Sequence, residues 1–232
     1  MLAASGVVAG SPLLLVLAAG LAEPLVAATG LAPRQSQVAA TLVLQGGFGV
    51  LGYVAWRRLG PEPAAAAWSE FARGLPFGAV VALVELLVNR LVVVAATMVG
   101  HGEPVAGALL LEARRQRALL LQLPAPWWVL GAAIVLVVAP VAEELFFRGY
   151  VHRYLVRVVS LPAWPAAALS AFSFALVHGF VAHLPGLWAT GLVLALWYSR
   201  RGHIGAAIGA HVAANALGLL ALLALGGQPV PS

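Results

Sequence analysis

The sequence carries little charge and lacks three residue types altogether. It contains no cysteine, no lysine and no aspartate, and only 9% of its 232 residues are charged. Without cysteine there is no disulfide framework, no thiol nucleophile and no thiolate metal site. A soluble domain typically gives about a quarter of its residues to charge. The composition therefore excludes a water-soluble globular enzyme.

Hydrophobic residues make up 62% of the chain, and its mean hydropathy is +0.97. Charges and Pro/Gly clusters divide the sequence into about seven apolar segments, each near the roughly 20 residues that a helix needs to cross a bilayer. The segments cover residues 1–22, 35–56, 75–100, 126–142, 164–177, 184–199 and 204–225. Continuous apolar runs favour helices over a β-barrel. The sequence thus predicts an all-α, polytopic transmembrane bundle of about seven to eight helices.

The stretches between these segments are predicted as polar connections. Residues 60–74 are rich in proline, and a loop after residue 100 holds two glutamates and three arginines. The N-terminal run lacks the basic start of a signal peptide, so we expect it to be the first span. The net charge of +5 does not indicate nucleic-acid binding, because the arginines punctuate apolar segments instead of forming one basic face. The predicted partner is the lipid bilayer.

Ionisable residues within apolar segments are costly in lipid and mark candidate functional sites. The first such motif is Glu143-Glu144-Leu-Phe-Phe-Arg148. Glu144 and Arg148 stand at i and i+4 with the acid first, which is the favourable order for an ion pair within a helix. Glu143 points about 100° away from Glu144 and has no partner on its own helix. It is therefore the candidate proton acceptor, unless both glutamates lie just past the membrane edge.

Two further motifs carry imidazole and amide groups. Phe174-Ala-Leu-Val-His178 closes an apolar helix, and His211-Val-Ala-Ala-Asn215 places two polar side chains one turn apart in the last segment. Singly, such residues more often serve helix packing. Together, a carboxylate, two imidazoles and a carboxamide on three helices provide what is needed to activate a water and stabilise an oxyanion. The remaining histidines of interest fall in loops or at helix ends and are expected to be solvated: His101, His152, His183 and His203.

The order EExxxR, FxxxH and HxxxN resembles the CPBP family of membrane proteins, which includes CAAX prenyl endopeptidases, bacteriocin-processing proteins and Abi-type bacteriocin immunity proteins. The resemblance covers about residues 127–225 and includes the stretch Gly-x₆-Tyr-x-Arg-Arg, which begins at Gly191. It implies variable N-terminal transmembrane helices in residues 1–118 and a catalytic core in residues 119–232. It also implies an intramembrane endopeptidase that acts on a membrane-associated protein or peptide. The high content of arginine, alanine, glycine and valine favours a bacterial source, so we expect the protein in a bacterial cytoplasmic membrane.

The resemblance also implies roles for individual residues. Glu143 is implied as the general base, and His178 helps to hold and activate the water. His211 and Asn215 are implied to stabilise the oxyanion. The supporting residues are Glu144, Arg148 and Phe174.

Two alternatives stay open at this stage. Glu143, His178 and His211 could form a His₂Glu zinc site with an open position. We prefer a metal-free mechanism without a cofactor, because Asn215 is a poor zinc ligand and a good oxyanion donor. The second alternative is a membrane protein without catalytic activity, such as an immunity or assembly factor, that uses the same polar network structurally. A secondary transporter is disfavoured, because the sequence shows no internal repeat.

Overall fold

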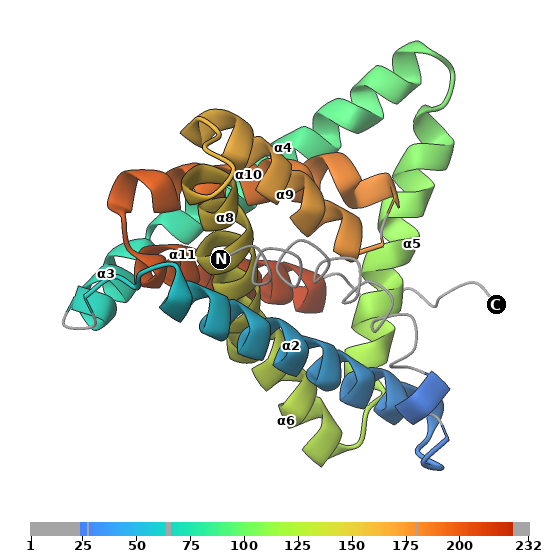
Figure 1. Cartoon of the computed structure of the whole chain (residues 1–232). Helices are drawn as coiled ribbons and strands as arrows, with labels where there is room; N and C mark the ends of the chain where they lie inside the picture. Colours follow the sequence, from blue (N-terminus) through green and yellow to red (C-terminus); the bar gives the residue numbers. More distant parts are fainter. Residues whose placement is uncertain (1–23, 27, 64–65, 180, 225–232) are drawn as a thin grey trace.

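The computed structural model describes residues 24–26, 28–63, 66–179 and 181–224, and every regular element there is a helix (Figure 1). This confirms the predicted all-α class. In chain order the elements are α2 (Pro33–Arg58), α3 (Ala67–Gly74), α4 (Phe77–Met98), α5 (Gly102–Leu121), α6 (Ala125–Ala133), η2 (Ile134–Val138), α7 (Ala139–Glu144), η3 (Leu145–His152), α8 (Arg153–Arg157), α9 (Ala163–Val177), η4 (Val181–His183), α10 (Leu184–Arg201) and α11 (Ile204–Ala224).

Five helices in the described part of the chain are long and apolar enough to cross a bilayer: Pro33–Arg58, Phe77–Met98, Ala125–Arg157, Val181–Arg201 and Ile204–Ala224. They correspond to five of the predicted apolar segments. The predicted fifth segment forms α9, whose 15 residues reach only about 22 Å. The predicted first segment, residues 1–22, lies outside the described residues. The fold is a transmembrane helix bundle, and the division between residues 118 and 119 stays a prediction.

One predicted connection is wrong. The charged stretch after residue 100 is not a loop but the 20-residue helix α5, which pairs with α4 across a turn at Gly100 (φ 80°) (Figure 1). Its alanines, leucines, glutamates and arginines are all strong helix formers. The charge of these residues predicts a polar loop on hydropathy alone, but charge does not oppose helix formation. In the same way, the proline-rich stretch ends in the short helix α3.

The central helix runs without a break from Ala125 to Arg157. The predicted apolar segment ends at residue 142, and the sequence leaves two positions open for the glutamates that follow, inside the membrane or just past its edge. In the structure the helix continues through both glutamates, which are buried with exposed fractions of 6% and 0%. They therefore do not lie past the edge of the bundle. Partners from other helices, described below, make this burial tolerable.

Two π-helical segments, η2 and η3, interrupt the α-helical pattern of the central helix on either side of the glutamates. In η2 the N–H of Ala139 donates to the carbonyl of Ile134, five residues back. The next carbonyl, that of Val135, would in the same register accept from residue 140. Residue 140 is proline and has no N–H. The Val135 carbonyl therefore needs a donor from elsewhere, because lipid supplies none.

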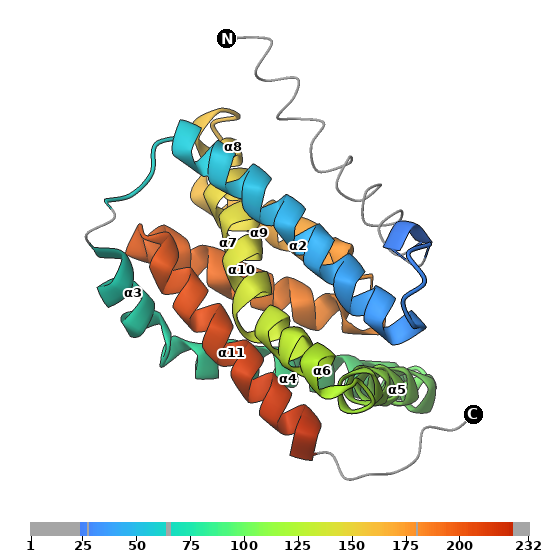
Figure 2. The ribbon, with the colours of Figure 1, turned by 90° about the horizontal axis from the view of Figure 1, so that it is seen from below.

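The central helix lies between α2 and α11, as the view in Figure 2 shows. On the α2 side, the ring of Phe48 packs against Phe146 and Phe147, with centroid distances of 4.9 and 5.7 Å. On the α11 side, helix α7 and η2 contact α11 directly. The three helices thus bring residues from both ends of the sequence to the glutamates.

Two histidines expected to be solvated are buried. His152 and His203 are only 4% and 7% exposed. His152 contacts the hydroxyl of Ser199 at 3.2 Å, and His203 contacts the carbonyl of Pro63 at 3.1 Å. The prediction is wrong for these two because His152 packs against α10 and His203 packs against Pro63, in the connection before α3.

Candidate active site

Glu143 and Glu144 approach the same imidazole from opposite sides. The Nδ1 atom of His211 lies 2.8 Å from Oε1 of Glu144, and its Nε2 atom lies 3.8 Å from Oε2 of Glu143. A carboxylate without a proton only accepts hydrogen bonds, so the first contact places a proton on Nδ1. The Nε2 atom of His211 is thereby held toward Glu143. Adjacent glutamates that point apart along one helix still meet at a residue 67 positions away.

Glu144 is also bound to Arg148, as the i, i+4 spacing predicts. Nη1 of Arg148 donates to Oε1 of Glu144 at 2.8 Å, and both side chains are fully buried. Nη2 of Arg148 donates to the carbonyl of Gly191 on α10, also at 2.8 Å. The guanidinium carbon lies 5.0 Å from the centroid of the Phe174 ring. The buried charge of Glu144 thus has one cationic partner and one imidazole partner.

Glu143 has a partner that the sequence did not reveal. Nε2 of Gln45, on α2, donates to Oε1 of Glu143 at 2.7 Å. Gln45 is itself buried, with 6% of its surface exposed. No periodicity or spacing rule connects two residues that are 98 positions apart. The only signal in the sequence is a polar side chain within an apolar segment.

His178 lies at the end of α9 and is half-buried. Its Nδ1 atom lies 2.7 Å from the carbonyl oxygen of Phe174, four residues earlier. Because a carbonyl accepts, Nδ1 carries the proton and Nε2 is left as an acceptor. The ring of Phe174 contacts both imidazoles, with centroid distances of 4.5 Å to His178 and 5.9 Å to His211. The FxxxH spacing therefore positions the histidine through its own backbone.

Asn215 supplies the donor that the central helix lacks. Its Nδ2 atom donates to the carbonyl of Val135 at 2.8 Å. This is the carbonyl that the proline at position 140 leaves without a backbone donor. The amide of Asn215 thus fastens α11 to η2, one turn after His211. One of its two Nδ2 hydrogens is used by this bond.

The contacts assemble part of the predicted site into one network. Glu143, Glu144, Arg148 and His211 are joined by direct polar contacts, and Phe174 packs against this network. His178 joins it through the Phe174 ring, and Asn215 through η2. The structure thus shows the contacts of each of these residues, whereas their catalytic roles stay predictions.

The zinc alternative does not find its ligand set in this arrangement. Among the described residues, no group of three or more His, Cys, Asp or Glu side chains lies close enough together to hold a metal ion. Glu143, His178 and His211 therefore do not form such a group in the described part of the chain. The preference for a mechanism without a cofactor stays a prediction.

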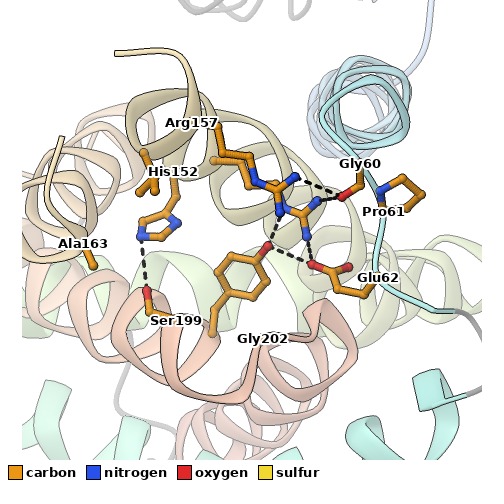
Figure 3. Close-up of a pocket in the computed structure, with 11 residues that line it drawn as sticks. Gly60, Pro61, Glu62, His152, Arg157, Ala163, Ser199 and Gly202 are labelled. Atoms are coloured by element: carbon orange, nitrogen blue, oxygen red, sulfur yellow. Dashed lines mark hydrogen bonds and ion pairs between the residues drawn. The ribbon is translucent and has the colours of Figure 1, made fainter. Parts of the chain in front are cut away.

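A cavity of about 330 Å³ lies elsewhere, near the junction of η3 and α8 (Figure 3). It is lined by residues of the α2–α3 connection, of η3 and α8, and of α10, and none of the predicted catalytic residues lines it. Arg153 pairs with Glu62 and its Nε atom donates to the Tyr198 hydroxyl at 2.6 Å; that hydroxyl in turn donates to Glu62 at 2.9 Å. The indole of Trp56 donates to the other oxygen of Glu62 at 2.8 Å. These residues tie the α2–α3 connection to the bundle.

The Gly-x₆-Tyr-x-Arg-Arg stretch of α10 contacts three other parts of the protein. The carbonyl of Gly191 accepts from Arg148, and a Cβ at this position would lie 3.1 Å from Ala171. Tyr198 belongs to the cluster beside the cavity. Arg201 donates to both carboxylate oxygens of Glu70 on α3. The stretch thus connects α10 to the central helix, to the α2–α3 connection and to α3.

A comparison with protein families finds one match. Residues 125–217 match the family model for Type II CAAX prenyl endopeptidase Rce1-like proteins. The matched region begins at α6 and ends within α11, so it includes all the predicted motif residues but not α2 to α5. No curated protein and no solved structure matches the chain. The match confirms the family predicted from the motifs and indicates a protease. Residues 125–217 of this chain are therefore similar to the type II CAAX prenyl endopeptidases of the Rce1-like family.

Proposed function

We propose that this protein is an intramembrane endopeptidase in which Glu143 acts as the general base. The observation that carries the proposal is the buried carboxylate of Glu143, whose Oε2 atom lies 3.8 Å from Nε2 of His211 inside an apolar bundle. A carboxylate and an imidazole at this separation suit the two ends of a hydrolytic step. The match of residues 125–217 to the Rce1-like family supports peptide-bond hydrolysis as that step.

In the proposed reaction, Glu143 takes a proton from a water, and the resulting hydroxide attacks the carbonyl carbon of the scissile peptide bond. His178, with its proton on Nδ1, offers Nε2 as an acceptor that holds the water. The negative charge moves to the carbonyl oxygen, where His211 and the second Nδ2 hydrogen of Asn215 stabilise it. The carbon–nitrogen bond then breaks, and Glu143 returns its proton to the leaving amine.

The supporting residues hold this arrangement in place. Glu144 accepts from Nδ1 of His211 and fixes which nitrogen faces Glu143. Arg148 neutralises Glu144 and anchors it to the carbonyl of Gly191. The ring of Phe174 contacts both imidazoles, and the Phe174 carbonyl orients His178. These contacts provide the preorganisation that acyl-transfer chemistry needs.

The proposed substrate is a protein or peptide at the membrane surface or within it. The family description names prenylated CAAX proteins as one substrate class. The high alanine, glycine and arginine content favours a bacterial cytoplasmic membrane as the location. In such a membrane, the second candidate substrate class is a peptide without a prenyl group. The two classes are separated by testing both.

The test uses the full chain in detergent or proteoliposomes with a farnesylated CAAX peptide and its unmodified counterpart, and identifies products by mass spectrometry. Glu143→Gln keeps the size of the side chain and removes the base. We expect kcat/KM to fall by about 10²- to 10⁴-fold, with the thermal unfolding temperature unchanged. Glu103→Gln, an exposed position on α5, is the matched control and keeps full activity. Unchanged turnover in Glu143→Gln contradicts the proposal.

The same assay addresses the metal question. We expect cleavage to survive exhaustive chelation, since the mechanism uses only a carboxylate, imidazoles and an amide. Bound zinc in stoichiometric amount, whose removal abolishes cleavage and whose return restores it, would contradict the metal-free mechanism.

The alternative is a non-catalytic immunity or assembly factor. It is favoured by the fact that His178 and Asn215 both contact backbone carbonyls, as structural residues do. In that case Glu143→Gln retains biological activity, and neither peptide is cleaved by the unmodified protein. The cleavage assay therefore separates the two functions.

A further inference from the structure

Helix α2 contributes a polar side chain to the candidate active site, although it lies outside the region that matches the family. Gln45 donates from Nε2 to Oε1 of Glu143 at 2.7 Å. It is the one side chain of α2 with a described polar contact to a predicted catalytic residue. A site built from residues 125–217 alone would leave this oxygen of Glu143 without its donor.

The approach of α2 to the central helix is set by small residues on one face. Gln45, Gly49 and Gly52 are spaced i, i+4 and i+7, so they share that face. A Cβ added to Gly52 would lie 2.6 Å from the carbonyl carbon of Leu145, and one added to Gly49 would lie 3.6 Å from Cβ of Ala142. Glycine at position 52 is therefore required for the helices to come this close. This fixed approach brings Gln45 within hydrogen-bonding reach of Glu143.

The contact distinguishes the two oxygens of the carboxylate. Oε1 of Glu143 accepts from Gln45, whereas Oε2 is the oxygen that lies 3.8 Å from Nε2 of His211. The Nε2 atom of glutamine can only donate, so the bond fixes the rotation of the carboxylate about its last torsion. With Oε1 held, Oε2 is directed toward the imidazole. A freely rotating carboxylate would lose this orientation.

We infer that Gln45 is a positioning residue for the Glu143 carboxylate, so that the catalytic arrangement of this chain extends beyond the family region into α2. The inference rests on the proposed function of Glu143 as general base. Gln45 does not touch the reacting atoms. It acts by holding one carboxylate oxygen so that the other faces the site. The competing explanation is that Gln45 only joins two helices, and that explanation predicts an effect on stability alone.

The experiment compares Gln45→Met with Gln37→Met in the full chain. Methionine has nearly the shape of glutamine but no amide donor, and Gln37 is an exposed position on the same helix. We expect Gln45→Met to lower kcat about 10- to 100-fold, as misorientation of a catalytic group does, with KM within about twofold. Gln37→Met keeps both constants. A helix-joining residue would change the unfolding temperature without this selective loss in kcat.

A second variant covers the case in which Gln45→Met does not fold. Gln45→Asn keeps the amide but shortens the side chain by one methylene, so the donor no longer reaches Glu143, and we expect the same selective fall in kcat. If either folded variant keeps kcat within twofold of the unmodified protein, the inference is overturned while the proposed function stands. If Glu143→Gln is itself fully active, the proposed function fails, and the inference fails with it.

Discussion

The ion pair between Glu144 and Arg148 offers a direct test of what holds the site together. Both side chains are fully buried, and Arg148 is the one cation in contact with Glu144 in the described part of the chain. Replacing Arg148 by methionine removes the positive charge and leaves a side chain of similar length. Glu144 then keeps a buried negative charge whose one described partner is the imidazole of His211. An uncompensated charge in a protein interior destabilises by about 3–5 kcal/mol.

The second variant removes both charges. In Glu144→Gln/Arg148→Met no buried charge remains at these positions, and the carbonyl of the new glutamine can still accept from Nδ1 of His211. We therefore expect the double variant to be more stable than Arg148→Met alone. The free energy of unfolding is measured by denaturant titration in mixed micelles for the unmodified protein, both single variants and the double variant. The double-mutant cycle then gives the coupling energy.

The expected coupling energy exceeds about 1 kcal/mol in favour of the pair. Two results would refute the reasoning. One is Arg148→Met within about 0.5 kcal/mol of the unmodified protein, which is the range of an exposed position. The other is a double variant whose loss equals the sum of the two single losses, because that outcome would show that the charges do not act together.

The remaining predictions concern packing and charge. Gly52→Ala places a Cβ 2.6 Å from the Leu145 carbonyl carbon, so we expect the free energy of unfolding to fall by about 1–3 kcal/mol. In the control Gly46→Ala, the added Cβ meets nothing within 4 Å, and this variant should unfold at or above the temperature of the unmodified protein. Equal unfolding temperatures for both variants would argue against the close helix contact. At Glu70, outside the spans, the hydrogen bonds from Arg201 and then from Arg73 hold the pKa of the carboxyl below its ordinary value. The stabilisation it gives is present above the unfolded pKa of about 4.3 and is lost as the pH falls toward the lower folded value. The stability difference between the unmodified protein and Glu70→Gln should therefore shrink on acidification, and a difference independent of pH would contradict this.

The apolar segments could be found from the sequence because lipid demands a local property, a run of about 20 apolar residues. Helix α5 was not predicted because hydropathy identifies only segments that can lie in lipid. A charged segment can also form a helix when its residues favour that conformation. The burial of Glu143 and Glu144 inside the bundle could not be decided from the sequence, for another reason. A charge marks the end of a span unless a partner compensates it, and the partners come from other helices. Only the tertiary structure shows them.

The candidate site divides in the same way. The contact between Glu144 and Arg148 follows from helix geometry and could be predicted. The orientation of His178 by the carbonyl of Phe174 also lies within one helical turn. The bond from Gln45 to Glu143 could not be predicted, because 98 residues separate the two and no local pattern fixes the register of α2 against the central helix.

The bond between Asn215 and the Val135 carbonyl has a consequence for how the protein admits a substrate. The proline at position 140 supplies no N–H, so separating α11 from η2 would leave the Val135 carbonyl without a donor from the protein. We therefore expect α11 and the central helix to travel as one rigid body during catalysis, with His211 carried at a constant distance from the glutamates. Entry of a peptide then requires helices other than α11 and the central helix to move. The hinge of that movement must lie where no backbone carbonyl loses its hydrogen-bond donor.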